Sequence, residues 1–440
     1  MIILFIKYYL LKKVIPKIQI TVVRKMTKSI EIMAPAGSYE SLMAAINAGT
    51  HSVYLGVEQL NMRARAANNF TMQDLTKIIK ICRKNNVKAC LALNTVMYDH
   101  DLRLMRRICD TAKKSGLTAV ILSDIAALQY ARSIGLEVHM STQTNITNME
   151  AVKFYAQFAD VMVLARELTL KQIAVICNKI KKENIIDPSG NLVKIEIFVH
   201  GALCVAISGK CYMSLAVYNA SANRGACLQN CRRSYIIKDE ETGDELKIDN
   251  KYIMSPKDLC TIGFIDKLIE AGVSVFKIEG RGRSPEYVDV TVNCYREAAE
   301  SYFAGSYTQE KIDSWTKRLE TVFNRGFWHG GYYLGKKLGE WSGSYGSQST
   351  IEKIYVGRVR NYFQKAKVGY IKLETGGIST DQEILITGPT TGVIQQKVRS
   401  MFLNNKKITE ARKGDNITLH IKEKIRPNDK IYVLNNITKK

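Results

Sequence analysis

Residues 31–57, EIMAPAGSYESLMAAINAGTHSVYLGV, contain the strand, helix and second strand that decide the fold of this chain. Glu31–Pro35 and Ser52–Val57 are short apolar runs of strand length, and Tyr39–Ala48 between them has the period of a helix. Gly49 follows this helix, where a left-handed C-cap is expected. Two apolar strands joined through a helix predict a parallel pair that the helix covers.

The same alternation continues along most of the chain. We predict strands at Glu31–Pro35, Ser52–Val57, Lys88–Thr95, Ala119–Asp124, Glu137–Thr144, Asp160–Ala165, Lys194–Gly201 and Ser274–Gly280. We predict helices at Tyr39–Ala48, Met72–Asn85, Leu102–Ser115, Ala126–Ser133, Met149–Gln157, Leu170–Glu183, Lys257–Ala271 and Glu286–Ala304. Eight repeats in about 270 residues fit a TIM-like (β/α)8 barrel better than an open, doubly wound sheet. The predicted fold class is therefore α/β, with the barrel over residues 30–335.

After residue 345 the sequence becomes rich in strand-forming residues, with turns at Gly376-Gly377, Gly388-Pro389 and Gly414-Asp415. A small C-terminal β-barrel is predicted over residues 345–440. Its basic residues are numerous enough to form one positive face: Arg358, Arg360, Lys397, Arg399, Lys406, Lys407, Arg412 and Lys413. A solvated surface without a partner is the alternative interpretation.

The first 29 residues are predicted to be a basic leader outside the barrel. Their apolar runs are interrupted by Lys7 and Lys12-Lys13 and end at Pro16, so they are too short to span a bilayer. We favour an extension upstream of Met26 that is disordered in solution. A basic segment lying on an anionic membrane surface is the alternative.

The composition favours a cytoplasmic protein with a polyanionic partner. Nothing resembles a cleavable secretory signal, and the ten cysteines are not spread as disulfide pairs, which argues against a secreted, disulfide-stabilised protein. The formal net charge of +23 favours a nucleic acid, and RNA first. A lysine-rich proteome would explain the charge equally well.

Polar residues gather at the predicted carboxyl ends of the strands, where the chemistry of such barrels lies. They are Asn61, Arg63, Arg65, Asn68, Asn94, Asp124, His139, Ser141, Gln143, Arg166, Glu167, His200, Lys277, Glu279 and Arg281. We expect these side chains to converge on one mouth.

Four cysteines lie close together after the seventh strand, in a predicted insertion at about residues 202–255: Cys204, Cys211, Cys227 and Cys231. Four thiolates can hold a [4Fe-4S] cluster or a structural zinc. Zinc sites more often use two close CxxC-like pairs, so the wide spacing on glycine-containing loops favours the cluster. Cys260, expected in the first turn of the next helix, is a candidate accessory ligand.

A cysteine nucleophile with His200 as its base is the rival interpretation, because His200 and Cys204 are close in sequence. It gives no reason for three further cysteines nearby. A histidine at a strand end is also as often a hydrogen-bonding core residue as a catalyst.

Ten positions in and after the seventh strand resemble the signature of the collagenase-like peptidase U32 family: Glu196, Phe198, Gly201, Ala202, Leu203, Cys204, Gly209, Cys211, Met213 and Ser214. The resemblance extends to APAGSYESLMAAINAGTHSVYLG, NRGACLQNCR, MSPKDLC, FKIEGRGRSPEYV and FNRGFWHGG, and so covers Glu31 to about Gly335. The tail resembles the C-terminal β-barrel of the family. The leader is not part of the family pattern.

The resemblance implies several functions. The family name implies proteolysis, whereas some members resemble iron–sulfur proteins that hydroxylate RNA or a quinone precursor. The branch with a C-terminal barrel and a CxxxC pair implies 5-hydroxyuridine formation at the wobble position of tRNA, with prephenate as a co-substrate. By that resemblance the [4Fe-4S] ligands are Cys204, Cys211, Cys227 and Cys231. The quinone branch takes its fourth cysteine from farther downstream, which keeps Cys260 in reserve.

This interpretation gives roles to the residues at the mouth. Guanidinium groups bind carboxylates in bidentate fashion, so a dicarboxylate such as prephenate is assigned to Arg63, Arg65 and Arg281, with Arg283 nearby. Salt bridging across loops is the alternative. The predicted catalytic residues, which orient the substrate, are Asn94, Gln143, His200 and Glu279.

Two further hypotheses stay open. A peptidase would need a nucleophile and its base, and no Ser/His/Asp arrangement or HExxH motif supports one. A non-catalytic RNA-binding or assembly factor would use the cluster only structurally. The wobble base is already single-stranded, so placing it in a cavity would cost little.

Overall fold

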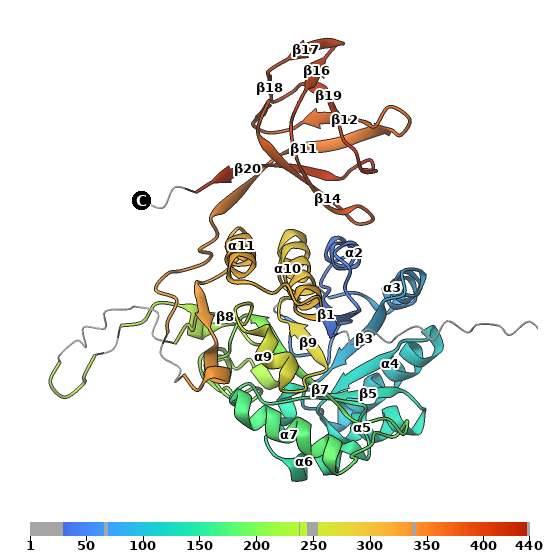
Figure 1. Cartoon of the computed structure of the whole chain (residues 1–440), viewed down its shortest axis with the longest axis vertical. Coiled ribbons are helices and arrows are strands. Elements are labelled where there is room, and N and C mark those ends of the chain that lie inside the picture. The colour runs from blue at the N-terminus through green and yellow to red at the C-terminus, as the bar shows by residue number, and fades with distance from the viewer. Residues whose placement is uncertain (1–29, 66–68, 237, 244–253, 337–339, 438–440) are drawn as a thin grey trace, which may run out of the picture.

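The computed structural model describes residues 30–65, 69–236, 238–243, 254–336 and 340–437. In this part of the chain, a parallel barrel wrapped by helices lies beside a smaller antiparallel β-domain (Figure 1). The predicted leader, residues 1–29, lies outside the described residues. None of the helices described is both long and apolar enough to cross a membrane.

Eight parallel strands form the barrel: β1 (Glu31–Pro35), β2 (Ser52–Leu55), β3 (Lys88–Leu93), β4 (Ala119–Leu122), β5 (Glu137–Met140), β6 (Val161–Val163), β7 (Lys194–Gly201) and β9 (Val275–Ile278). Each strand from β1 to β7 pairs with the next one along the chain. Strand β9 pairs with both β7 and β1, which completes the ring. The predicted TIM-like barrel is confirmed. The carboxyl ends of all eight strands lie at the same end of the barrel, which we call the rim.

Helices cover the outside of the barrel: α2 (Tyr39–Asn47), α3 (Met72–Lys84), α4 (Leu102–Ser115), α5 (Ile125–Ser133), α6 (Met149–Ala156), α7 (Leu170–Lys182), α9 (Ile265–Glu270) and α10 (Pro285–Phe303). Local sequence sets several helix ends. Ser38 and Thr71 accept hydrogen bonds from the first turns of α2 and α3, and Gly116 ends α4 with φ 75°. Helix α8 (Met213–Tyr218) lies in the insertion, and α11 (Gln309–Glu320) is a further helix that we did not predict.

The predicted helix Lys257–Ala271 is wrong in its first half. Asp258–Cys260 forms a short strand, β8, which pairs antiparallel with the end of β7 and parallel with β10 (Phe327–His329). Strand β7 is eight residues long beside three in β6 and four in β9, so its last backbone groups are free for β8 to satisfy. Helix α9 begins only at Ile265, and Cys260 is a fully buried strand residue.

A separate antiparallel β-domain follows the barrel, as predicted. Its strands are β11 (Ile351–Phe363), β12 (Val368–Leu373), β13 (Gly377–Ser379), β14 (Glu383–Gly388), β15 (Gly392–Lys397), β16 (Met401–Leu403), β17 (Lys406–Ile408), β18 (Glu410–Arg412), β19 (Asn416–His420) and β20 (Lys430–Asn436). Eight of them form one sheet around a core of their own, and β13 pairs with β18 beside it. Within the described residues β15 and β17 are the edges of that sheet, so hydrogen bonding does not close it into a full ring.

The β-domain packs against the flank of the barrel. Asn47 Nδ2, at the end of α2, donates a hydrogen bond to the carbonyl oxygen of Thr391 in the turn between β14 and β15 (3.0 Å). Lys353 Nζ of β11 forms an ion pair with Glu286 Oε1 of α10 at 2.6 Å. Figure 1 shows the domain over α2, α10 and α11. The β-domain therefore rests on outer helices of the barrel.

Replacing Gly392 with alanine is expected to loosen this contact. Gly392 has φ +75°, and a Cβ there would lie 2.9–3.0 Å from atoms of Asn47, Ala44 and Met43. Gly414 is a matched control, because it has φ +99° and nothing within 4 Å of the added Cβ. Both Gly→Ala variants should lose about 1–2 kcal/mol of unfolding free energy through left-handed backbone strain. Only the Gly392→Ala variant should speed proteolysis of the segment that joins the domains; equal cleavage of both variants would contradict this.

Candidate functional site

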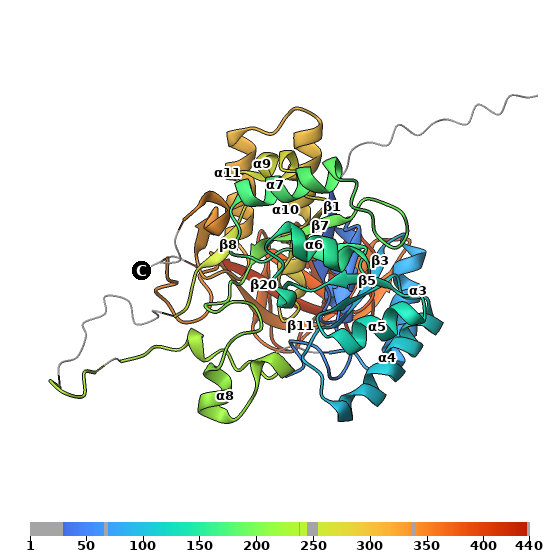
Figure 2. The same cartoon turned by 90° about the horizontal axis from the view of Figure 1, so that it is seen from below.

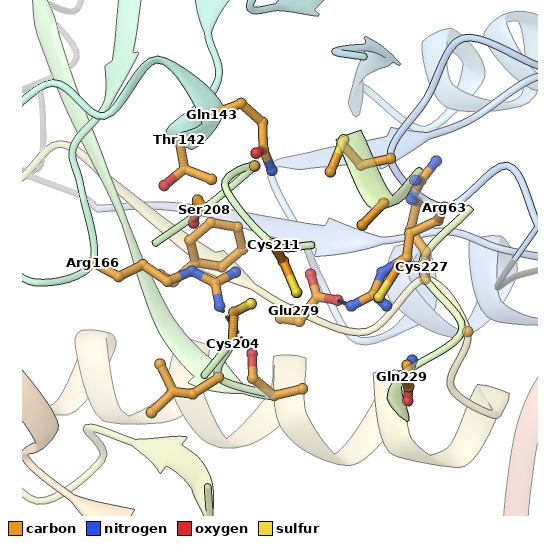
Figure 3. A pocket seen from close by; sticks show the side chains of 18 of the residues that line it. Arg63, Thr142, Gln143, Arg166, Cys204, Ser208, Cys211, Cys227, Gln229 and Glu279 are labelled. Atoms are coloured by element: carbon orange, nitrogen blue, oxygen red, sulfur yellow. Dashed lines mark hydrogen bonds and ion pairs between the residues drawn. The ribbon is translucent and has the colours of Figure 1, made fainter. Parts of the chain in front are cut away.

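A cavity of about 240 Å³ opens at the carboxyl ends of the barrel strands. The loops after β2, β3, β5, β6 and β9 and the insertion after β7 supply its lining residues, some of which are labelled in Figure 3. Of the predicted site residues, it brings together Arg63, Asn94, Gln143, Glu279, Arg281, Cys204, Cys211, Cys227 and Cys231. His200 and Arg65 are not among the residues that line it.

The insertion places four thiols on this cavity. Figure 3 shows the side chains of Cys204, Cys211 and Cys227 directed into the same space. Cys204 is exposed, and the other three cysteines are half-buried. Burial raises the pKa of the Cys231 thiol to about 11; Arg232 opposes this rise, and the other three thiols add to it. The four sulfur atoms are therefore close enough to influence one another's charge.

Hydrogen bonds within the protein hold the insertion over the rim. Arg232 donates to the carbonyl oxygens of Leu203 (2.5 Å) and Pro256 (2.7 Å), which ties the start of the insertion to its end. Arg224 lies 2.6 Å from Asp101, directly before α4, and so ties the insertion to the loop after β3. These contacts fix both ends of the cysteine-bearing segment to the barrel.

The four cysteines on the cavity are donors of the kind that soft metal centres use. Among the described residues, no three histidine, cysteine or carboxylate side chains lie close enough together to hold one metal ion. A zinc ion would need its sulfur ligands at about 2.3 Å. Four cysteine thiols line this one cavity, and four cysteines are the donor set by which a [4Fe-4S] cluster is held.

An ion pair lines the cavity between the loops after β2 and β9. Arg63 Nη2 lies 2.7 Å from Glu279 Oε1. Burial would raise the pKa of the Glu279 carboxyl, but the charges of Arg63 and of two further arginines lower it to about 2. Glu279 therefore stays a carboxylate at neutral pH, which suits a role in positioning Arg63 and not in donating a proton.

Two arginines in the cavity keep donors without partners. Arg281 Nη2 donates to Asn61 Oδ1 at 2.9 Å, and its buried Nη1 has no partner among the described residues. Arg166 lies over the Phe198 ring at 4.0 Å and donates from Nη1 to the carbonyl oxygen of Ala202, while its Nε has no such partner. An unsatisfied buried guanidinium donor is costly, and an anion in the cavity would relieve that cost.

A buried charge pair reaches the cavity through Lys277, which is one of its lining residues. Lys277 Nζ is 2.6 Å from Glu196 Oε1, and both residues are almost fully buried. The ammonium group also lies 4.8 Å from the centroid of the Tyr54 ring. His139 Nδ1 is 3.9 Å from Glu196 Oε2. The sequence placed Lys277 at the rim but showed no partner for it, because Glu196 is 81 residues away.

His200 points away from the cavity, although Phe198 of the same strand, β7, lines the cavity. A bulge between Phe198 and His200 shifts the register of β7 against β9 and breaks the alternation of side chains. The imidazole ring therefore packs against Tyr287 and Tyr295 of α10. Burial is the main reason that the pKa of His200 falls to about 3. His200 is thus a neutral packing residue in this structure, outside the cavity where we expected it.

The predicted polar residues differ in what they contact. Asn94 accepts a hydrogen bond from the backbone N–H of Met62 (3.2 Å) and donates one to Ser141 Oγ (3.1 Å), so it joins three loops. Gln143 lines the cavity, and its buried Oε1 has no partner among the described residues. Arg65 is exposed. Its backbone N–H donates a hydrogen bond to a carbonyl oxygen of the insertion (3.1 Å). Arg166, to which the sequence gave no specific role, lines the cavity, whereas Arg65 does not.

Comparison with known proteins gives one family and two kinds of relative. The model of peptidase family U32 matches residues 37–343. A protein named collagenase, from Porphyromonas gingivalis strain W83, is 57% identical over 91% of this chain and 97% of its own length. The tRNA hydroxylation protein P1 of Bacillus subtilis strain 168 is 30% identical over 69% of this chain and 70% of its own. A 23S rRNA 5-hydroxycytidine synthase of Escherichia coli K12 is 34% identical over 62% and 39%, respectively.

Removing one partner of the buried pair should cost more than removing both. Lys277→Met leaves Glu196 as an unpaired buried carboxylate and is expected to lower the free energy of unfolding by about 3–5 kcal/mol. The double variant Glu196→Gln/Lys277→Met removes both charges and should recover most of that loss in urea denaturation. An equal loss in the two variants would show that packing, and not charge pairing, holds this region.

Proposed function

This chain belongs to peptidase family U32, and we propose that it is an iron–sulfur enzyme that hydroxylates a pyrimidine in RNA, the wobble uridine of tRNA. One observation carries the proposal: four cysteines and a surplus of arginines line the same cavity at the barrel mouth. A redox centre and an anionic co-substrate would meet there. Relatives named for tRNA hydroxylation and rRNA hydroxycytidine synthesis support an RNA base as the substrate.

The proposed cofactor is a [4Fe-4S] cluster, for which the ligands would be Cys204, Cys211, Cys227 and Cys231. When bound, such a cluster supplies one-electron redox chemistry. The protein itself keeps the four thiols on one cavity through the hydrogen bonds of Arg232 and Arg224. Cys260 is buried behind β7 and has no place in this set.

The proposed co-substrate is a small dicarboxylate, prephenate. Arg166 and Arg281 line the cavity, and each has a buried guanidinium N–H without a partner among the described residues, whereas Arg63 is already engaged by Glu279. We therefore assign the anion to Arg166 and Arg281, with Arg63 positioned beside them. The exposed Arg65 has no part in this cavity.

We assign the contacts with the target base to the side-chain amides of Gln143 and Asn94. An extruded base is recognised through hydrogen bonds to its Watson–Crick edge. A uracil edge offers both acceptors and a donor, and an amide side chain offers both as well. Gln143 lines the cavity from the loop after β5, and its buried Oε1 has no partner among the described residues, while Asn94 lines the cavity from the loop after β3. An anticodon loop presents its wobble base unpaired, so little stacking would be lost on entry.

Proteolysis is the second candidate function, because a relative named collagenase matches 91% of the chain at 57% identity. A peptidase with a cysteine or serine nucleophile needs a base beside it. No histidine lines the cavity as far as the structure describes it, and His200 packs behind β7 with a lowered pKa. The geometry of the site thus gives this second function less support than the first.

Cluster binding is the first test. Anaerobically purified protein is expected to contain about four irons and four sulfides per chain and to be brown. Cys227→Ser should lose most of this iron, whereas Cys260→Ser, which changes a cysteine away from the cavity, should keep it. Iron and sulfide counting with an absorption spectrum measures both. Stoichiometric zinc, or iron that survives the Cys227→Ser change, would contradict the cluster.

RNA modification is the second test. In cells that lack this chain, mass spectrometry of tRNA nucleosides should show loss of 5-hydroxyuridine-type modifications, and wild-type protein should restore them. The Cys227→Ser variant should not, while Cys260→Ser should. Unchanged nucleosides together with cleavage of gelatin by the purified protein would favour the peptidase instead.

A further inference from the structure

The insertion carries an exposed apolar surface on its outer side. Helix α8 projects from the rim of the barrel (Figure 2). We define the insertion face as Tyr212, Leu215, Val217, Tyr218 and Leu228, which are 75%, 38%, 60%, 44% and 40% exposed. A helix in a folded domain ordinarily buries its apolar side, whereas the short helix α8 and its flanks leave these five apolar or aromatic side chains at least 38% exposed. The insertion face is therefore suited to a partner.

The charge of the insertion points to the kind of partner. Residues 202–236, the part of the insertion that reaches the cavity, contain neither aspartate nor glutamate, and their cations are Lys210, Arg224, Arg232 and Arg233. The rest of the insertion, to residue 255, carries six acidic residues and three lysines. The whole chain has a formal net charge of +23. Arg224 is paired with Asp101, so the attraction for a polyanion comes from the remaining cations of this part and from the net charge of the chain, because phosphates release counterions when cations replace them.

Two tyrosines near the cavity are paired with arginines. Arg233 lies 5.3 Å from the centroid of the Tyr218 ring and also donates a hydrogen bond to its hydroxyl. Arg224 lies 4.0 Å from the centroid of the Tyr98 ring, which is 53% exposed in the loop after β3. The ion pair with Asp101 holds Arg224 in place. Exposed rings stack unpaired bases, and adjacent guanidinium groups meet the phosphates between them.

These pairs lie beside the cavity that would take the target base. Asn223 and Arg232 line the cavity, and they directly precede Arg224 and Arg233 in the chain. A nucleotide with its base in the cavity would leave its neighbours on the rim. Those neighbours would be within reach of the exposed rings.

We propose that the insertion face and the two tyrosine–arginine pairs bind the unpaired nucleotides on either side of the target base. The RNA is then recognised as a single-stranded loop, with its sequence read only where a base enters the cavity. Stacking on aromatic rings tolerates any base, so this surface selects unpaired structure and not sequence. The proposal rests on the proposed function in one respect, because it takes RNA as the substrate.

RNA affinity of the full-length protein tests the proposal without any need for catalysis. The probe is a fluorescently labelled RNA hairpin with an unpaired loop, and a fully paired RNA duplex is the comparison, both followed by fluorescence anisotropy. Tyr212→Ala/Tyr218→Ala is expected to weaken hairpin binding about tenfold or more and duplex binding much less. Tyr212→Phe/Tyr218→Phe keeps both rings and should bind like wild type. Phe154→Ala removes a 54% exposed ring from α6, outside the rim, and is the matched control.

The paired arginine gives a second measurement. Arg233→Gln should lower the slope of log affinity against log salt concentration by about 0.7, the value for one phosphate contact on a single strand. An unchanged slope would remove the phosphate contact from the proposal.

Other outcomes decide the proposal as a whole. Wild-type affinity in the double alanine variant, or an equal loss for hairpin and duplex, would overturn it. Normal RNA binding by that variant with reduced modification in cells would assign the face to a protein partner and overturn it too. Because the assay reads affinity alone, it can fail while the nucleoside test succeeds, and it can succeed while that test fails.

Discussion

The pairing of β9 with both β7 and β1 is the constraint on which the whole structure depends. These backbone hydrogen bonds close the ring, and because all eight strands run in the same direction, their carboxyl ends meet at one rim. Closure is what brings Arg63 within 2.7 Å of Glu279, a residue 216 positions away. It also places the insertion after β7 across the same opening. The cavity is therefore a product of barrel topology, with its chemistry supplied by loops.

The cavity is built from charges that folding alone would not favour. Burying a charge without a partner lowers the stability of the folded state by roughly several kcal/mol. Lys277 has its partner in Glu196, and Arg63 has one in Glu279. Arg166 and Arg281 each have a buried N–H group that donates no hydrogen bond to any described residue. Natural proteins break the rule of satisfied polar groups mainly at functional sites, and an anion is the ligand that would restore it here.

The insertion has two sides with different chemistry. Its inner side carries four thiols on the cavity, and its outer side carries exposed aromatic and apolar residues among cations. Arg224 and Arg232 connect the two sides, because both anchor the segment to the barrel while lying next to residues of the outer surface. A partner held on the outer side would therefore be close to whatever the thiols hold. Under the proposed function, this proximity would join RNA recognition and the cluster in one short segment.

Local sequence was sufficient for the eight strand–helix repeats, the separate β-domain, the grouping of four cysteines and the polar residues at strand ends. Apolar periodicity and residue spacing are properties of neighbours along the chain, so they can be read before the chain is folded. Tertiary pairing alone decided that Cys260 is in a strand against β7 and that Lys277 meets Glu196. It also decided that a bulge in β7 turns His200 away from the cavity. Register and bulges arise between segments far apart in sequence, and no local pattern carries that information.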